Sequence, residues 1–138
     1  NDRPRWAPRD LKIAYTSAGN VMVMNANGTG ATVLAAGSNP DWSPDGKTLA
    51  YNCTYGGPSI IEICLVDLSA FPVVGTPLRL TTNNSIEYNP VWRPVGLMLA
   101  FQSNANGPDY EIYTMPPEVG ASFTQLTENG FTEAFPDW

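Results

Sequence analysis

Glu62 and Glu111 are the residues with the clearest capacity for chemistry, because each carboxylate directly precedes an isoleucine at a corresponding point of the chain. Paired carboxylates can carry general acid and base catalysis when they face one substrate. The sequence has no histidine, which removes the commonest general base, and no Gly-x-Ser-x-Gly nucleophile motif. Since the two glutamates recur in different copies of a repeat, we expect structural roles, no catalytic residue and a protein that is not an enzyme.

Asp41 and Asp137 are a second set of candidate ligands, because each stands immediately before a tryptophan. If the strands that carry them surround a common axis, their oxygens could hold a Ca²⁺ ion in a central channel. The scattered spacing of the acidic residues lacks any loop like that of an EF-hand. We therefore predict no cofactor and no metal centre, with channel Ca²⁺ as the open alternative.

Cys53 and Cys64 are candidates for a disulfide bond. In the preceding unit a Gly19-Asn20 turn is expected to bring Ser17 and Met22 face to face, and the cysteines occupy the same positions in the next unit. Cross-strand neighbours can lie within disulfide range, and an even pair in a secreted-type composition favours the bond. The alternative is two small buried side chains. No Cys-x-x-Cys motif indicates redox catalysis.

These residues are positioned by a motif that occurs three times and then begins again. The full copies centre on Trp6, Trp42 and Trp92, and each has an alanine eight residues after its tryptophan. The segment Phe135-Pro136-Asp137-Trp138 starts a fourth copy, so the steps between tryptophans are 36, 50 and 46 residues. Periods of roughly 40–50 residues are typical of repeat proteins, whose units bury their apolar faces against neighbours. We expect the tryptophans to pack between units; a stacking platform for sugars or bases is the alternative.

Each unit contains four short segments that are rich in β-forming residues and separated by Gly, Pro and Asn. The first holds the tryptophan, and the other three are, unit by unit, Lys12–Ser17, Val21–Asn25 and Ala31–Leu34; Thr48–Cys53, Glu62–Val66 and Pro77–Thr81; Met98–Ser103, Glu111–Met115 and Phe123–Thr127. No stretch keeps helical periodicity without a breaker. The sequence therefore predicts an all-β protein whose units are four-stranded antiparallel β-propeller blades.

The predicted boundaries divide one domain, residues 1–138, into three blades and a remainder. Blade 1 covers about residues 2–36, blade 2 about 39–82 and blade 3 about 89–128, with an extra first strand at 133–138.

A family resemblance adds to this reading. The phrase Asn39-Pro40-Asp41-Trp42-Ser43-Pro44-Asp45-Gly46-Lys47, followed by Glu62-Ile63 and Arg79-Leu80-Thr81, resembles the WD-like propeller repeat of TolB-type proteins. The third copy is similar, with Tyr110-Glu111-Ile112-Tyr113 and Gln125-Leu126-Thr127. The resemblance implies six-bladed rings, a periplasmic or secreted location and a scaffold role. The same repeat also serves the non-catalytic domains of secreted peptidases, so it predicts fold better than function.

Three blades alone would expose two apolar faces and unpaired strand edges. Two copies related by a two-fold axis would complete a six-bladed ring, and we predict this homodimer; a piece of a longer propeller is the alternative. The terminal segment would then take the place of the partner's first strand. The candidate inter-protomer residues are Ala134, Phe135, Pro136, Asp137, Trp138, Arg5 and Trp6.

Charge limits the partners. A net charge of −6 and a pI near 4.3 argue against nucleic acid, and no apolar run approaches the ~20 residues needed to span a membrane, so insertion is not expected. The loops on one face of the disc are acidic and carry two aromatic residues. These predicted binding residues are Glu87, Tyr88, Asp109, Glu128, Glu133 and Tyr55. We expect them to dock a protein with a basic surface, with a solvated rim as the alternative.

The function that the sequence favours is a non-enzymatic scaffold for protein–protein interaction that assembles through its open blade edges. An accessory propeller domain of a secreted hydrolase, positioning a peptide or glycan, is the main alternative. A minimal repeat array that binds only itself is the third.

Overall fold

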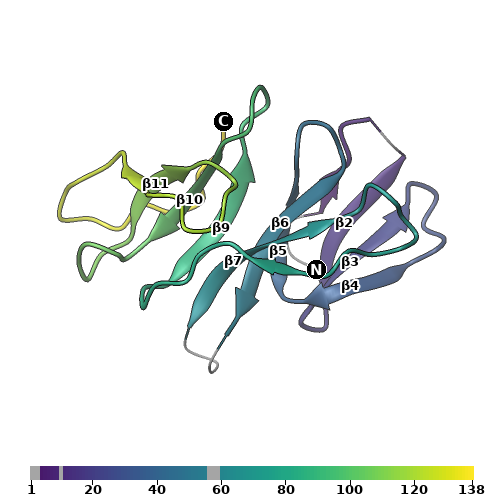
Figure 1. Cartoon of the computed structure of the whole chain (residues 1–138), viewed down its shortest axis with the longest axis horizontal. Helices are drawn as coiled ribbons and strands as arrows, with labels where there is room; N and C mark the ends of the chain where they lie inside the picture. The colour runs from purple at the N-terminus through teal and green to yellow at the C-terminus, as the bar shows by residue number, and fades with distance from the viewer. Residues whose placement is uncertain (1–3, 10, 56–59) are drawn as a thin grey trace.

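Three four-stranded antiparallel sheets, standing side by side as blades, make up the computed structural model, which describes residues 4–9, 11–55 and 60–138 (Figure 1). No helix occurs among these residues. The predicted all-β class and the four antiparallel strands of each blade are confirmed.

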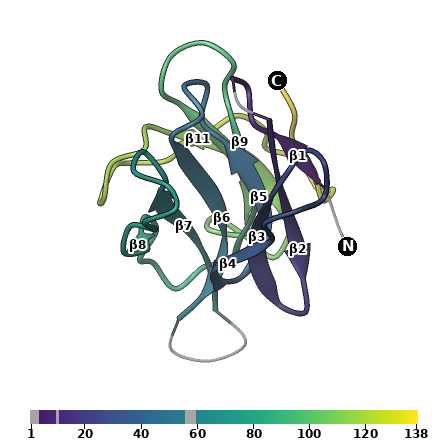
Figure 2. The same ribbon diagram turned by 90° about the vertical axis from the view of Figure 1, so that its right-hand side faces the viewer.

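In every blade the strands follow one another in chain order, so that the tryptophan-bearing strand is one edge and the fourth strand is the other. Blade 1, which faces the viewer in Figure 2, consists of β1 (Arg5–Trp6), β2 (Lys12–Ser17), β3 (Asn20–Asn25) and β4 (Thr32–Ala36). Blade 2 consists of β5 (Ser38–Trp42), β6 (Thr48–Thr54), β7 (Ile61–Asp67) and β8 (Leu78–Arg79). Blade 3 consists of β9 (Glu87–Trp92), β10 (Leu99–Ser103), β11 (Glu111–Met115) and β12 (Thr124–Gln125).

The predicted boundaries differ from the structure at several ends. The fourth strands of blades 2 and 3 are only two residues long, shorter than the predicted segments. Residues 133–138 form no strand, although an extra first strand was predicted there. A first strand pairs with the second strand of its own blade, and residues 133–138 belong to none of the three sheets. Residues 2, 3, 10 and 56–59, which fall within the predicted blades, lie outside the described residues.

The β2–β3 hairpin turns one residue earlier than predicted. Ser17 pairs with Asn20, so the two turn residues are Ala18 and Gly19, with φ angles of 48° and 76°. Positive φ at both central residues is the requirement of a type I′ turn. As a result Met22 lies opposite Tyr15, and the predicted Ser17–Met22 pairing is wrong.

Blade 2 is buried on both faces because alternate side chains of its strands point to opposite neighbours. The cluster shared with blade 1 comprises Ala7, Ala14, Val21, Val23, Leu34, Trp42, Leu49, Tyr51, Cys53, Cys64, Val66 and Leu68. The cluster shared with blade 3 comprises Ala50, Ile63, Leu65, Leu80, Trp92, Leu99, Phe101, Tyr113 and Met115. Trp42 and Trp92 are thus packed between blades, as expected from their recurrence.

No helix among the described residues is long and apolar enough to cross a membrane.

Candidate functional site

Glu62 and Glu111 hold the fourth strand of their blades in place. The Thr127 hydroxyl donates to the Glu111 carboxylate (2.5 Å) and accepts the Ile112 backbone N–H (2.9 Å). Blade 2 repeats the arrangement with Thr81, whose hydroxyl donates to Glu62. The Thr127 hydroxyl and the Asn129 N–H lower the pKa of Glu111. These carboxylates have the same structural role in both blades, and the expectation that neither is catalytic stays a prediction.

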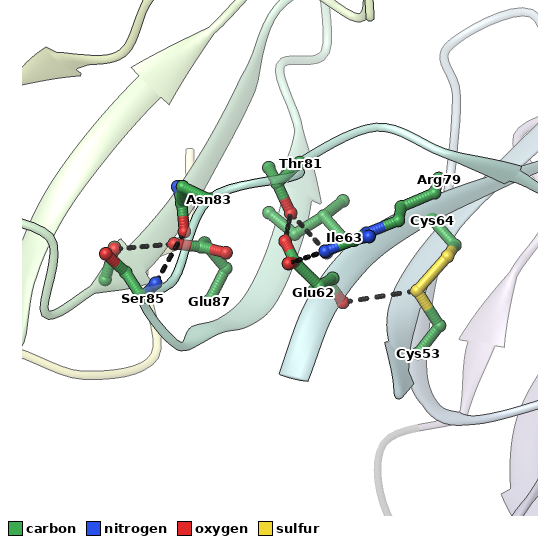
Figure 3. A network of polar contacts seen from close by, with 10 residues as sticks. Cys53, Glu62, Ile63, Cys64, Arg79, Thr81, Asn83, Ser85 and Glu87 are labelled. Carbon is green, nitrogen blue, oxygen red and sulfur yellow. Dashed lines mark hydrogen bonds and ion pairs between the residues drawn. A yellow bond between two sulfur atoms is a disulfide. The ribbon is translucent and has the colours of Figure 1, made fainter. Parts of the chain in front are cut away.

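Glu87 lies against Glu62 at the junction of blades 2 and 3, and both side chains are fully buried (Figure 3). Glu62 forms an ion pair with Arg79, whereas Glu87 Oε1 accepts the Ser103 hydroxyl at 2.9 Å. The second oxygen of Glu87 is buried and has no hydrogen bond of ordinary geometry to the described residues, although the nearby Asn83 side chain lowers the pKa of Glu87. Burial and the hydrogen bond with Glu62 raise the pKa of Glu87 to about 7. A proton on Glu87 Oε2 accounts for both the buried oxygen and the raised pKa, because the resulting hydroxyl can donate to the Glu62 side chain.

The predicted acidic docking surface is therefore smaller than the sequence suggests. Glu87 is buried and unavailable to a partner, which corrects its assignment as a surface contact. Tyr88 is half-buried against Tyr110, with ring centroids 5.8 Å apart, and Tyr55 lies beneath the Arg79 guanidinium, 4.9 Å from its ring centroid. Sequence reasoning missed Arg79, a cation at this surface; its place in the Arg-Leu-Thr phrase beside the Glu62 strand was the available signal.

The remaining acidic residues gather around one groove of about 470 Å³ in blade 3. Asp109, Glu111 and Glu128 line it. Glu133 lies nearby and accepts the Asn129 side-chain amide at 2.8 Å. Of these four residues, Glu128 is exposed and the other three are half-buried or buried. Docking of a basic protein here stays a prediction.

Asp41 links all three blades near the inner strands. Its Oδ2 accepts the Trp92 backbone N–H at 2.7 Å, and its Oδ1 lies 3.4 Å from Arg5 Nε. Burial raises the pKa of Asp41 to about 6. Asp137 accepts the N–H of Trp138 at 3.0 Å. The described residues contain no group of three or more His, Cys, Asp or Glu side chains placed to hold a metal ion, and channel Ca²⁺ stays an untested alternative.

Cys53 and Cys64 form a disulfide bond, as predicted, and no described cysteine is free. The register expected for them is wrong. Cys53 lies opposite Glu62, and Cys64 lies opposite Tyr51, so the two cysteines are diagonal neighbours with Cα atoms 5.8 Å apart. This distance is within the usual disulfide range, which is why the bond forms despite the shifted register.

Among the described residues, two blade faces have no neighbouring blade. The N-terminal face is the side of blade 1 turned away from blade 2 and comprises Trp6, Ile13, Tyr15, Met22, Met24 and Val33. The C-terminal face is the side of blade 3 turned away from blade 2 and comprises Ala100, Ile112, Thr114 and Leu126. Trp6 is 62% exposed against 6% for Trp42, and Leu126 is 58% exposed against 1% for Leu80. Side chains that are buried at the internal junctions are therefore exposed at both ends.

The predicted inter-protomer residues lie at these same ends. Arg5 and Trp6 pair with Ala14 and Ile13 of their own blade. The segment Ala134–Trp138 lies along the inner edge of blade 3, where Phe135 N–H donates to Gln102 and the Trp138 indole donates to the Val91 carbonyl.

Comparison with known proteins supports the fold. No family model matches the sequence. The structure assigned as TolB from Agrobacterium tumefaciens aligns with 99% of this chain at a TM-score of 0.82 and 19% identity, and TolB from Acinetobacter baumannii aligns with 95% at 0.73 and 25% identity. The β-propeller domain of the Trilobed protease from Pyrococcus furiosus, described as having an open velcro topology, aligns with 91% at 0.66 and 14% identity.

The chain spans only 49%, 33% and 42% of these three proteins, respectively. The resemblance read from the repeats is confirmed at the level of the fold: this chain consists of three β-propeller blades of the kind found in the TolB structures.

Proposed function

We propose that this protein is a non-enzymatic scaffold for protein–protein interaction that assembles through its two open blade faces. The observation that carries the proposal is the repeat relationship between those faces. The C-terminal face is equivalent in the repeat to the face of blade 1 that packs on blade 2, and to the face of blade 2 that packs on blade 3. The N-terminal face is equivalent to the opposing faces of blades 2 and 3 at the same two junctions. One copy's N-terminal face therefore fits another copy's C-terminal face.

The two copies therefore meet head to tail, and two copies of three blades each form a closed six-bladed ring. Propellers with six blades lie within the usual range of about 4–8. A head-to-tail contact that closes after two copies forms a ring with two identical junctions. Each junction buries Trp6 and Leu126, the residues whose internal counterparts are almost fully buried. The Cys53–Cys64 disulfide supports placing this scaffold in an oxidising compartment, such as the periplasm or the extracellular space.

Two single variants test the head-to-tail arrangement. Met22→Glu places a charge on the N-terminal face, and Ile112→Glu places one on the C-terminal face; both residues are half-buried in the single chain. Either change is expected to weaken self-association by at least about 100-fold, because an unpaired buried carboxylate costs about 3 kcal/mol or more. Mixing the two variants restores one junction, which joins the intact face of each. Analytical ultracentrifugation of each variant and of the mixture checks this result.

The same experiment can contradict the proposal. If only one of the two variants loses association, identical faces meet each other and the head-to-tail arrangement is wrong. Glu128→Lys, a charge change at an exposed residue outside both faces, is the matched control and should leave association unchanged.

An accessory propeller domain of a hydrolase is the second candidate. The observation that favours it is the match to the propeller domain of the Pyrococcus protease. In that case the neighbouring blades come from the same polypeptide. A chain that stays monomeric at high concentration, with both face variants indistinguishable from it, is the result this candidate expects.

A further inference from the structure

The segment Phe135–Trp138 already sits on blade 3 as a first strand sits on the blade before it. At each junction a backbone N–H three residues before the tryptophan donates to a side chain of the preceding second strand. In chain order the bonds run from Asn39 to Thr16, from Asn89 to Asn52 and from Phe135 to Gln102, each 3.0 Å long. Residues 135–138 therefore contact blade 3 through the same type of hydrogen bond that links blade 1 to blade 2 and blade 2 to blade 3.

The backbone of Phe135 and the indole of Trp138 also resemble their counterparts at the internal junctions. The φ angles of Asn39, Asn89 and Phe135 are 51°, 56° and 58°. A bulky residue such as phenylalanine rarely adopts positive φ, so docking on blade 3 must stabilise this conformation. The Trp138 indole donates to the Val91 carbonyl at 3.4 Å, as the Trp42 indole donates to the Arg5 carbonyl at 3.1 Å.

The segment Phe135–Trp138 covers only part of the C-terminal face. Trp138 is 48% exposed and Phe135 is 62% exposed, whereas Trp42 and Trp92 are below 10%. Ile112 and Leu126 of the C-terminal face stay uncovered to different degrees, half-buried and 58% exposed. The segment therefore buries much less apolar surface than a whole blade would, and a docking blade can displace it.

In the head-to-tail dimer, β1 of the second copy would occupy the position beside blade 3 that Phe135–Trp138 now holds. In the repeat, Arg5-Trp6 corresponds to Asp137-Trp138, so only one of the two pairs can occupy the first-strand position of a blade seated on blade 3. Existing strand pairing decides between them. Arg5 and Trp6 already pair with Ala14 and Ile13 of their own blade, whereas residues 133–138 belong to no sheet. The incoming copy therefore keeps its own β1.

We propose that Ala134–Trp138 is a displaceable cap on the C-terminal face, and that a second copy of the chain must remove it to dock. This inference rests on the proposed self-assembly and names its regulation. A capped face is binding-competent only for the fraction of time during which the cap is open, and the apparent affinity falls by that fraction.

A variant that ends at Glu133 tests the cap. Its self-association, measured by analytical ultracentrifugation beside the unmodified chain, is expected to strengthen by about 100-fold, because each of the two junctions of the ring gains about 10-fold when a cap that is open about a tenth of the time is removed. Trp138→Ala retains the chain length but loses the indole bond and the stacking of Arg93, whose guanidinium lies 5.6 Å from the ring centroid. It should strengthen association in the same direction by a smaller factor. Thermal unfolding of both variants verifies that each is folded.

The outcomes separate this inference from the proposed function. Weaker association of the shortened variant overturns the cap, because the segment then serves as a shared strand between protomers. Unchanged association overturns it as well, since the segment is then not in the way. If neither the unmodified nor the shortened chain associates at any concentration, the proposed self-assembly is wrong, and so is the proposed role of the cap.

Discussion

The stability of the protein is expected to fall as pH rises from about 4.5 to about 7, and Glu87→Gln should remove most of that fall. Burial and the hydrogen bond with Glu62 raise the pKa of Glu87 to about 7 from its ordinary value of 4.5. Between these values the folded state binds more protons than the unfolded state, so the free energy of unfolding decreases with pH. The change is about 1–3 kcal/mol and is complete once pH exceeds the folded pKa.

Glutamine copies the protonated form of Glu87. Its amide group can donate to Glu62, and its oxygen can accept the Ser103 hydroxyl. The groups that face the pair are Arg79 and Thr81 on Glu62, and Ser103 and Asn83 on Glu87. Asp41, whose pKa is raised to about 6 by burial, contributes in the same direction, and its share remains in the variant.

Urea unfolding at several pH values between 4.5 and 8 measures the effect. Glu87→Gln should be more stable than the unmodified protein at pH 8 and nearly equal to it at pH 4.5. Glu128→Gln, at an exposed position, is the control and should leave the slope with pH unchanged. Parallel curves for the unmodified protein and Glu87→Gln would show that Glu87 is ionised throughout and would contradict the shared proton.

Removing the Cys53–Cys64 disulfide is expected to lower the free energy of unfolding by about 3 kcal/mol, the value for a loop of this size. Both cysteines are buried in the cluster between blades 1 and 2, so the paired change Cys53→Ala and Cys64→Ala also removes packing there. Thermal unfolding with and without a reducing agent separates the two contributions.

Reduction should lower the melting temperature of the unmodified protein and leave the double alanine variant unaffected. A melting temperature that does not respond to reduction, together with two free thiols by chemical titration, would show that the bond is absent from the folded protein.

The repeat made much of the fold readable from the sequence. The alanine eight residues after each tryptophan marks the second strand, and it lies opposite the residue before that tryptophan: Asp41 pairs with Ala50, and Val91 with Ala100. Such offsets survive because every junction must bury the same positions. The recurrence also identified the tryptophans as packing residues.

Local turn chemistry and burial were harder to read. The turn after β2 uses Ala18 at positive φ, a conformation that residue type disfavours, so the glycine-asparagine pair predicted it one residue late. Glu87 was placed on the surface because carboxylates are seldom fully buried. Its burial depends on Glu62 from another blade and on Ser103 from the neighbouring strand, contacts that no local pattern specifies.

The solution mass of the chain shows whether its open faces bind one another. Light scattering of the unmodified chain over a wide dilution series needs no variant and no partner. We expect a mass of twice 14.9 kDa at high concentration, falling to that of a single chain on dilution, with no larger species. A single-chain mass at every concentration, or assemblies that keep growing with concentration, would contradict it.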